Sequence, residues 1–70
     1  MDTEKLKISL YKYLYARDLK PMDIDFVDSY YIGIKFVAVF KVISSMQKQY
    51  LYTVSQRKNM IDIQFAKEAV

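Results

Sequence analysis

Apolar residues are concentrated most strongly between residues 30 and 44. Read with a period of two, one face of this run is wholly apolar and carries Ile32, Ile34, Phe36, Ala38, Phe40 and Val42. β-branched and aromatic residues in such a run are typical of a strand that is covered fully on one side and partly on the other. A helix is the alternative, but Lys35 and Lys41 and the absence of capping residues disfavour it. We therefore predict one long central strand over residues 30–44.

The N-terminal part of the chain, residues 3–19, predicts a helix. Helical spacing is followed by the core stripe Leu6, Leu10, Tyr13 and Leu14 and continues to Arg17. Asp2 or Thr3 can cap its first turn. Pro21 ends it, because proline disfavours helical geometry in the residue before it.

Tyr11 and Tyr15 form a second stripe beside this core stripe. In one interpretation the rings lean on the edge of the core and keep their hydroxyl groups in water. In the other, the rings form an exposed aromatic surface that contacts a partner. The spacing alone leaves both interpretations open.

Shorter alternating patterns predict two further strands. Residues 22–27 alternate Ile24 and Phe26 with two aspartates, Asp23 and Asp25, which we interpret as a solvated face rather than a metal site. The next two residues, 28–29, predict a turn. Residues 44–48 predict a hairpin loop, followed by a strand of about seven residues over 50–56.

The last stretch, residues 60–70, fits two patterns. Ile61, Ile63 and Phe65 alternate as in a strand, whereas Ile61, Phe65 and Ala69 recur at helical spacing. Asn59 is a possible N-cap for a helix, and the alanine-rich end favours one. We therefore predict an α+β fold: an α-β-β-β-α sandwich with a three-stranded antiparallel sheet and two helices on one face.

Composition restricts the function classes. The chain has 70 residues, enough for a single small domain over 1–70, and it contains neither Cys nor His. Cys nucleophiles, His acid–base chemistry and the common zinc ligands are therefore excluded, and we expect no enzyme, no metal and no cofactor. The net charge of +3 permits an anionic partner without requiring one. We expect no membrane segment, and an intracellular location in cytoplasm or nucleus.

The predicted order of elements resembles a double-stranded RNA-binding domain over nearly the whole chain. The family's L-x-x-Y pair is matched by residues 10–13, and its F-x-V-x-V strand resembles residues 36–40. A basic cluster opens the family's second helix, which continues through paired alanines. Arg57 and Lys58 match that cluster, and Ala66 and Ala69 match the alanines.

The resemblance implies which residues would contact duplex RNA, a ligand read largely by its shape and phosphates. The candidate positions are Lys12, Tyr15, Lys48, Arg57 and Lys58. However, the family's G-P-x-H loop is missing, and Asn59 and Asp62 replace two lysines of its basic cluster. These departures indicate a degenerate member of the family, and such members commonly mediate protein contacts.

We therefore expect a non-catalytic domain that acts mainly in protein–protein interaction or dimerisation, with weakened or lost RNA binding. The half-polar face of the central strand carries more apolar surface than a monomer usually exposes. It supplies the predicted interface residues Tyr31, Val37, Val39, Lys41 and Ile43. One alternative is genuine binding of double-stranded RNA through the first helix and the basic start of the second. Another is a small phage or viral protein that blocks a host factor.

Overall fold

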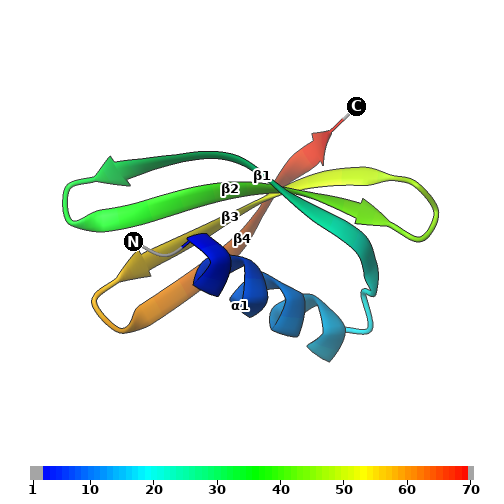
Figure 1. Ribbon diagram of the computed structural model, residues 1–70, viewed down its shortest axis with the longest axis horizontal. Coiled ribbons are helices and arrows are strands. Elements are labelled where there is room, and N and C mark those ends of the chain that lie inside the picture. The colour runs from blue at the N-terminus through cyan, green and yellow to red at the C-terminus, as the bar shows by residue number, and fades with distance from the viewer. Residues whose placement is uncertain (1–2, 70) are drawn as a thin grey trace.

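One helix packs against a four-stranded antiparallel sheet in the computed structural model, which describes residues 3–69 (Figure 1). The elements follow one another as α1 (Thr3–Ala16), β1 (Pro21–Ile32), β2 (Lys35–Ser44), β3 (Gln49–Arg57) and β4 (Met60–Ala69). Each strand pairs with its neighbour in the sequence, so the order across the sheet is β1-β2-β3-β4.

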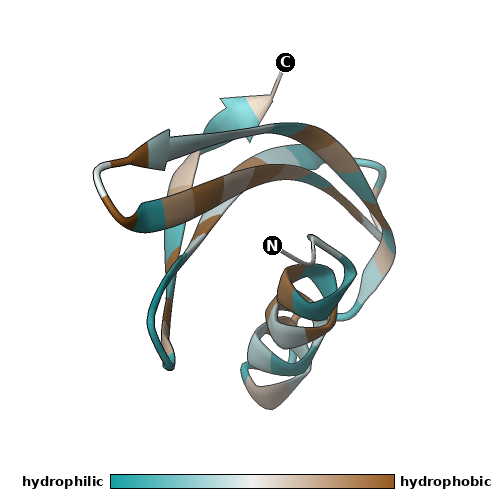
Figure 2. Cartoon of the chain, turned by 60° about the vertical axis from the view of Figure 1, so that its left-hand side comes forward, coloured by the Kyte–Doolittle hydropathy of each residue, from teal (hydrophilic) through white to brown (hydrophobic). Residues whose placement is uncertain are grey.

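The sheet is strongly curved, and α1 lies inside the curve against its concave face (Figure 2). Leucines spaced four residues apart place one stripe of α1 against the sheet. Alternate residues of β2 point toward this stripe, while those between them point to the convex face. The buried core is formed by Leu6, Leu10, Leu14, Ile24, Phe36, Ala38, Phe40, Val42 and Val54.

The helix ends three residues earlier than predicted, at Ala16. The Asp18 N–H donates to the Tyr15 carbonyl (3.0 Å) and the Leu19 N–H to the Leu14 carbonyl (2.9 Å). These two bonds form a Schellman motif, in which Asp18 adopts a φ of 58°. The chain therefore leaves the helix before Pro21. The proposed cap Asp2 lies outside the described residues.

The prediction of one strand over residues 30–44 is wrong, because the chain reverses direction at residues 33–34. Gly33 has a φ of 60°, which suits the first position of a tight type II′ hairpin turn. Tyr31 pairs with Phe36 and Ile32 pairs with Lys35 across this turn. The apolar run is thus divided between β1 and β2.

The turn predicted at residues 28–29 is absent, and both residues lie within β1. The pairing of β1 with β2 shifts between Phe26 and Asp28, which leaves Val27 as a β-bulge. A bulge bends a strand without ending it. Asp28 and Ser29 follow the bulge in regular pairing with Val39 and Ala38, so these polar residues are tolerated within the strand.

The predicted second helix is also wrong, and with it the α-β-β-β-α sandwich. Residues 60–69 form β4, which pairs with β3 through a two-residue loop containing Lys58 and Asn59. Ile61 and Ile63 pack against the core from this strand, so the alternating pattern determines its structure rather than the helical one. The correct architecture is one helix on a four-stranded antiparallel sheet.

Candidate functional site

Two of the predicted RNA-binding residues lie on the solvent side of α1. Lys12 and Tyr15 are both exposed, and they are three residues apart on the helix. The ring of Tyr15 stacks on that of Tyr11, with centroids 6.1 Å apart and planes 19° apart. The two tyrosines therefore form an aromatic pair, with Tyr11 half-buried against the core and Tyr15 open to solvent.

The other three predicted RNA-binding residues do not join them in one basic surface. Arg57 ends β3 and Lys58 lies in the β3–β4 loop, whereas Lys48 precedes the start of β3. A strand rises about 3.3 Å per residue, so roughly 30 Å of strand separate Lys48 from Lys58. Since residues 60–69 form a strand, there is no second-helix N-terminus here to receive a phosphate.

Four of the predicted interface residues lie on the convex face of the sheet. Alternation along β2 places Val37, Val39, Lys41 and Ile43 opposite the residues that face α1. Val37 is nevertheless only 4% exposed. Its direct neighbours across the sheet are Tyr30 and Ser55, which flank it on both sides. The middle of this face is therefore largely covered by its own strands.

The fifth predicted interface residue, Tyr31, lies on the other face. It pairs with Phe36, and the two ring centroids are 5.1 Å apart. Because the turn contains two residues, odd-numbered positions of β1 near it share a face with even-numbered positions of β2. Tyr31 therefore lies on the face of Phe36, opposite to the face that carries Val37 and Val39.

The β1–β2 hairpin ends in a group of large exposed side chains, which we call the apolar tip. Its members and their exposed fractions are Tyr30 (44%), Tyr31 (61%), Ile32 (57%) and Ile34 (66%). Figure 2 shows brown colouring on both sides of the turn at this end of the sheet. The β3–β4 loop, in contrast, consists of Lys58 and Asn59. Of these four residues only Tyr31 was among the predicted interface residues, although a single glycine between isoleucines, Gly33, was a usable signal for a turn.

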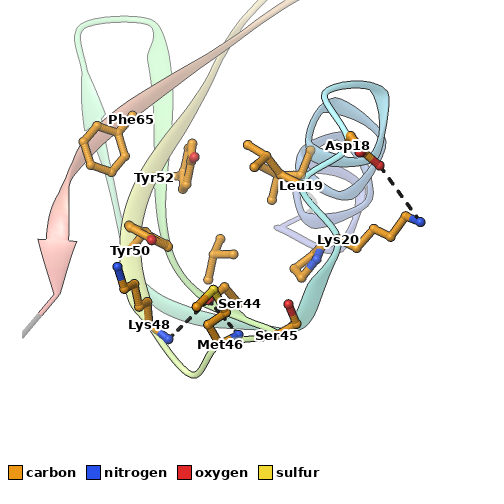
Figure 3. A pocket seen from close by; sticks show the side chains of 13 residues that line it. Asp18, Leu19, Lys20, Ser44, Ser45, Met46, Lys48, Tyr50, Tyr52 and Phe65 are labelled. Carbon is orange, nitrogen blue, oxygen red and sulfur yellow. Dashed lines mark hydrogen bonds and ion pairs between the residues drawn. The ribbon is translucent and has the colours of Figure 1, made fainter.

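A pocket of about 550 Å³ opens at the other end of the concave face, between the end of α1 and the β2–β3 loop. Figure 3 shows Tyr50, Tyr52 and Phe65 on its sheet side and Leu19 on its helix side. Lys20 and Asp18 form an exposed ion pair of 4.0 Å at its rim. Lys48 also lines the pocket, which is where this predicted RNA-binding residue lies.

The phenol of Tyr52 lines this pocket and has a pKa above its usual value. Burial raises the pKa of its phenol, and Tyr13 and Tyr50 raise it further, whereas Arg17 lowers it. The Arg17 guanidinium in turn lies 3.7 Å from the centroid of the Tyr13 ring. A phenol with a raised pKa is protonated at neutral pH, so it can donate a hydrogen bond but cannot act as a base there.

A metal cluster and a membrane-spanning helix are both absent from residues 3–69. No group of three or more acidic side chains in this range is arranged to hold a metal ion. The helix described there, α1, is not long and apolar enough to span a membrane. No protein-family model, no curated protein and no solved structure matches this chain.

Proposed function

We propose that this chain is a non-catalytic protein-interaction module that inserts its apolar tip into an apolar groove of a partner protein. The observation that carries this proposal is the exposure of Tyr30, Tyr31, Ile32 and Ile34 around a tight turn. Surface turns are normally built from polar residues, glycine and proline. Tyrosine is enriched at protein interfaces, since its ring packs while its hydroxyl group can stay hydrated.

The geometry of the turn supports this proposal. A two-residue loop closed by Gly33 holds the four side chains on a short, paired ribbon. Little conformational entropy is then lost on binding, because the backbone is already ordered. Full burial of a large apolar side chain is worth about 1.5–3 kcal/mol, so four half-exposed ones offer a substantial gain to a partner that covers them.

Site-specific photo-crosslinking tests the proposal. A photoreactive phenylalanine analogue replaces Ile34 in cells of the source organism, and the matched control carries it at Met46. Met46 is also apolar and exposed, but it lies in the β2–β3 loop at the opposite end of the sheet. We expect a discrete crosslinked protein from position 34 that position 46 does not give, and that Ile32→Asp abolishes.

Two outcomes would contradict the proposal. One is the same set of adducts from positions 34 and 46, which would show that position 34 has no specific partner. The other is co-sedimentation of the chain with anionic vesicles that is lost in the Ile32→Asp variant. That result would assign the tip to a membrane surface.

A further inference from the structure

The outer edge of β4 is a regular strand that has no neighbour among residues 3–69. β4 ends the strand order, so every second pair of its backbone N–H and C=O groups points away from β3. Residues 60–65 pair with β3 in one continuous register, and the only shift follows Phe65, at Ala66. A regular edge with unpaired backbone groups is a template for another strand.

The concave side of this edge is also apolar and incompletely covered. Ile61 and Ile63 pack against the core but remain partly exposed, and Phe65 is 54% exposed. The helix contacts β1 most and the other three strands less, so it covers β4 only in part. A strand added beside β4 would cover these side chains as well as the free backbone groups.

We infer that a second copy of this chain fills that position, with β4 pairing antiparallel to β4 across a two-fold axis perpendicular to the sheet. This symmetry keeps both helices on the same side and puts one residue opposite its own copy. The residue that faces its own copy on the axis can be Asp62, Ile63 or Gln64, because each choice keeps most of residues 60–65 paired. The side chains that each choice places opposite one another decide among the three registers.

The register centred on Ile63 satisfies the side chains best. It places Ile61 opposite Phe65 and Asp62 opposite Gln64, which joins apolar pairs on the concave face and a hydrogen-bonding pair on the convex face. Centring on Asp62 would place two carboxylates opposite each other, which is unfavourable. Centring on Gln64 would carry the pairing into the bulge at Ala66. In the Ile63 register, the side chains that lie opposite each other are therefore compatible on both faces of the sheet.

Single cysteines can test this register directly, because the chain contains no Cys. Directly opposed residues of antiparallel strands have Cα atoms about 4.5–5.5 Å apart, within the range that a disulfide bridges. Two thiols lose two electrons and two protons to a mild oxidant such as oxidised glutathione. We expect Ile63→Cys to form a covalent dimer at least ten times faster than Val27→Cys, the matched change on the exposed edge of β1.

A mixture of two different cysteine variants tests the register further. Ile61→Cys and Phe65→Cys should crosslink to each other faster than either does to itself, since each faces the other across the axis. Equal rates for all pairs would overturn the register. Equal rates for Ile63→Cys and Val27→Cys would overturn the pairing itself.

Light scattering over a range of concentrations gives a second measurement without cysteine. The original chain should show a concentration-dependent dimer, which Ile63→Lys removes and Val27→Lys preserves. Circular dichroism checks that both variants remain folded. A monomer at all concentrations for the original chain would refute the inference. The apolar tip lies outside this edge, so the photo-crosslinking result at Ile34 is independent of it.

Discussion

The two edges of the sheet differ in how they are protected against further pairing. β1 begins with Pro21, is interrupted by a bulge at Val27, and carries acidic residues at Asp23, Asp25 and Asp28. Each of these features is a known means of blocking an edge. β4 also has a bulge, at Ala66, and charges at Lys67 and Glu68, but these features follow Phe65, and residues 60–65 contain a single charged side chain, Asp62. The first half of β4 is therefore the less protected edge and the one more open to assembly.

The two edges also differ in how far α1 buries their side chains. Ile24 of β1 is completely buried beneath α1, whereas Ile63 of β4 is only partly covered. The β1 edge thus contributes to the core, while the β4 edge contributes less. If α1 supports the two edges unequally, equivalent substitutions at them should differ in their effect on stability.

Ile24→Ala should destabilise the fold far more than Ile63→Ala. Removing a buried isoleucine costs about 2–5 kcal/mol, because apolar burial is lost and a cavity remains. At Ile63 we expect about 1 kcal/mol, since the side chain is partly exposed already. Urea unfolding at a protein concentration below dimerisation measures both. Equal losses would show that α1 supports both edges alike.

Removing glycine from one turn and adding it to the other should change the free energy of unfolding in opposite directions. Gly33→Ala should lower the free energy of unfolding by about 1 kcal/mol, because Gly33 has positive φ and an added Cβ has no contact to gain. Lys58 has a φ of 56°, so Lys58→Gly should raise the free energy of unfolding by roughly 0.5–1 kcal/mol. Thermal unfolding of both variants measures the shifts. A loss of stability in Lys58→Gly would contradict the strain assigned to that turn.

The fold should become less stable at high pH through Tyr52, which lies on β3 and pairs with Phe65 of β4. Burial raises the pKa of this phenol in the folded state above its unfolded value near 10, so the unfolded chain releases the proton first. The contribution to stability is complete below pH 10 and is lost as the pH rises through the folded pKa. Unfolding measured from pH 8 to 11 should show a steeper fall for the original chain than for Tyr52→Phe. Identical slopes would refute this assignment.

Ile34→Asp should have the smallest effect on stability, less than about 0.5 kcal/mol, because its side chain is exposed. The same variant should lose binding through the apolar tip. Urea unfolding provides the measurement, with Met46→Asp as the control for a change at the other loop. A loss as large as that of Ile63→Ala would show that the apolar tip supports the fold rather than a partner.

Part of this fold could be predicted because local patterns and tertiary packing agree. Leu6, Leu10 and Leu14 have one period only, and the polar residues at 44–48 mark a loop that the structure confirms. Gln49–Arg57 likewise forms the strand predicted over 50–56. In each case no competing pattern exists.

The errors arose where one pattern continues through a change of structure. The alternation over residues 30–44 persists through the turn at Gly33, so it does not reveal that the chain reverses there. Residues 60–69 satisfy both periods, and pairing with β3 decides between them. The apolar tip was hidden for the same reason, because its residues looked like the interior of a strand. Duplex RNA binding stays a prediction, although the residues assigned to it are distributed over separate surfaces.

The strand order has a kinetic consequence. Each strand pairs with its sequence neighbour through a loop of two to four residues, so no pairing requires a long loop to close. Sheets with such local contacts fold faster than those with distant pairings. We expect folding within milliseconds, with successive hairpins adding to a growing edge. β4 joins β3 by the same reaction through which a second copy would join β4, so assembly of two chains would continue the chain's own folding pathway.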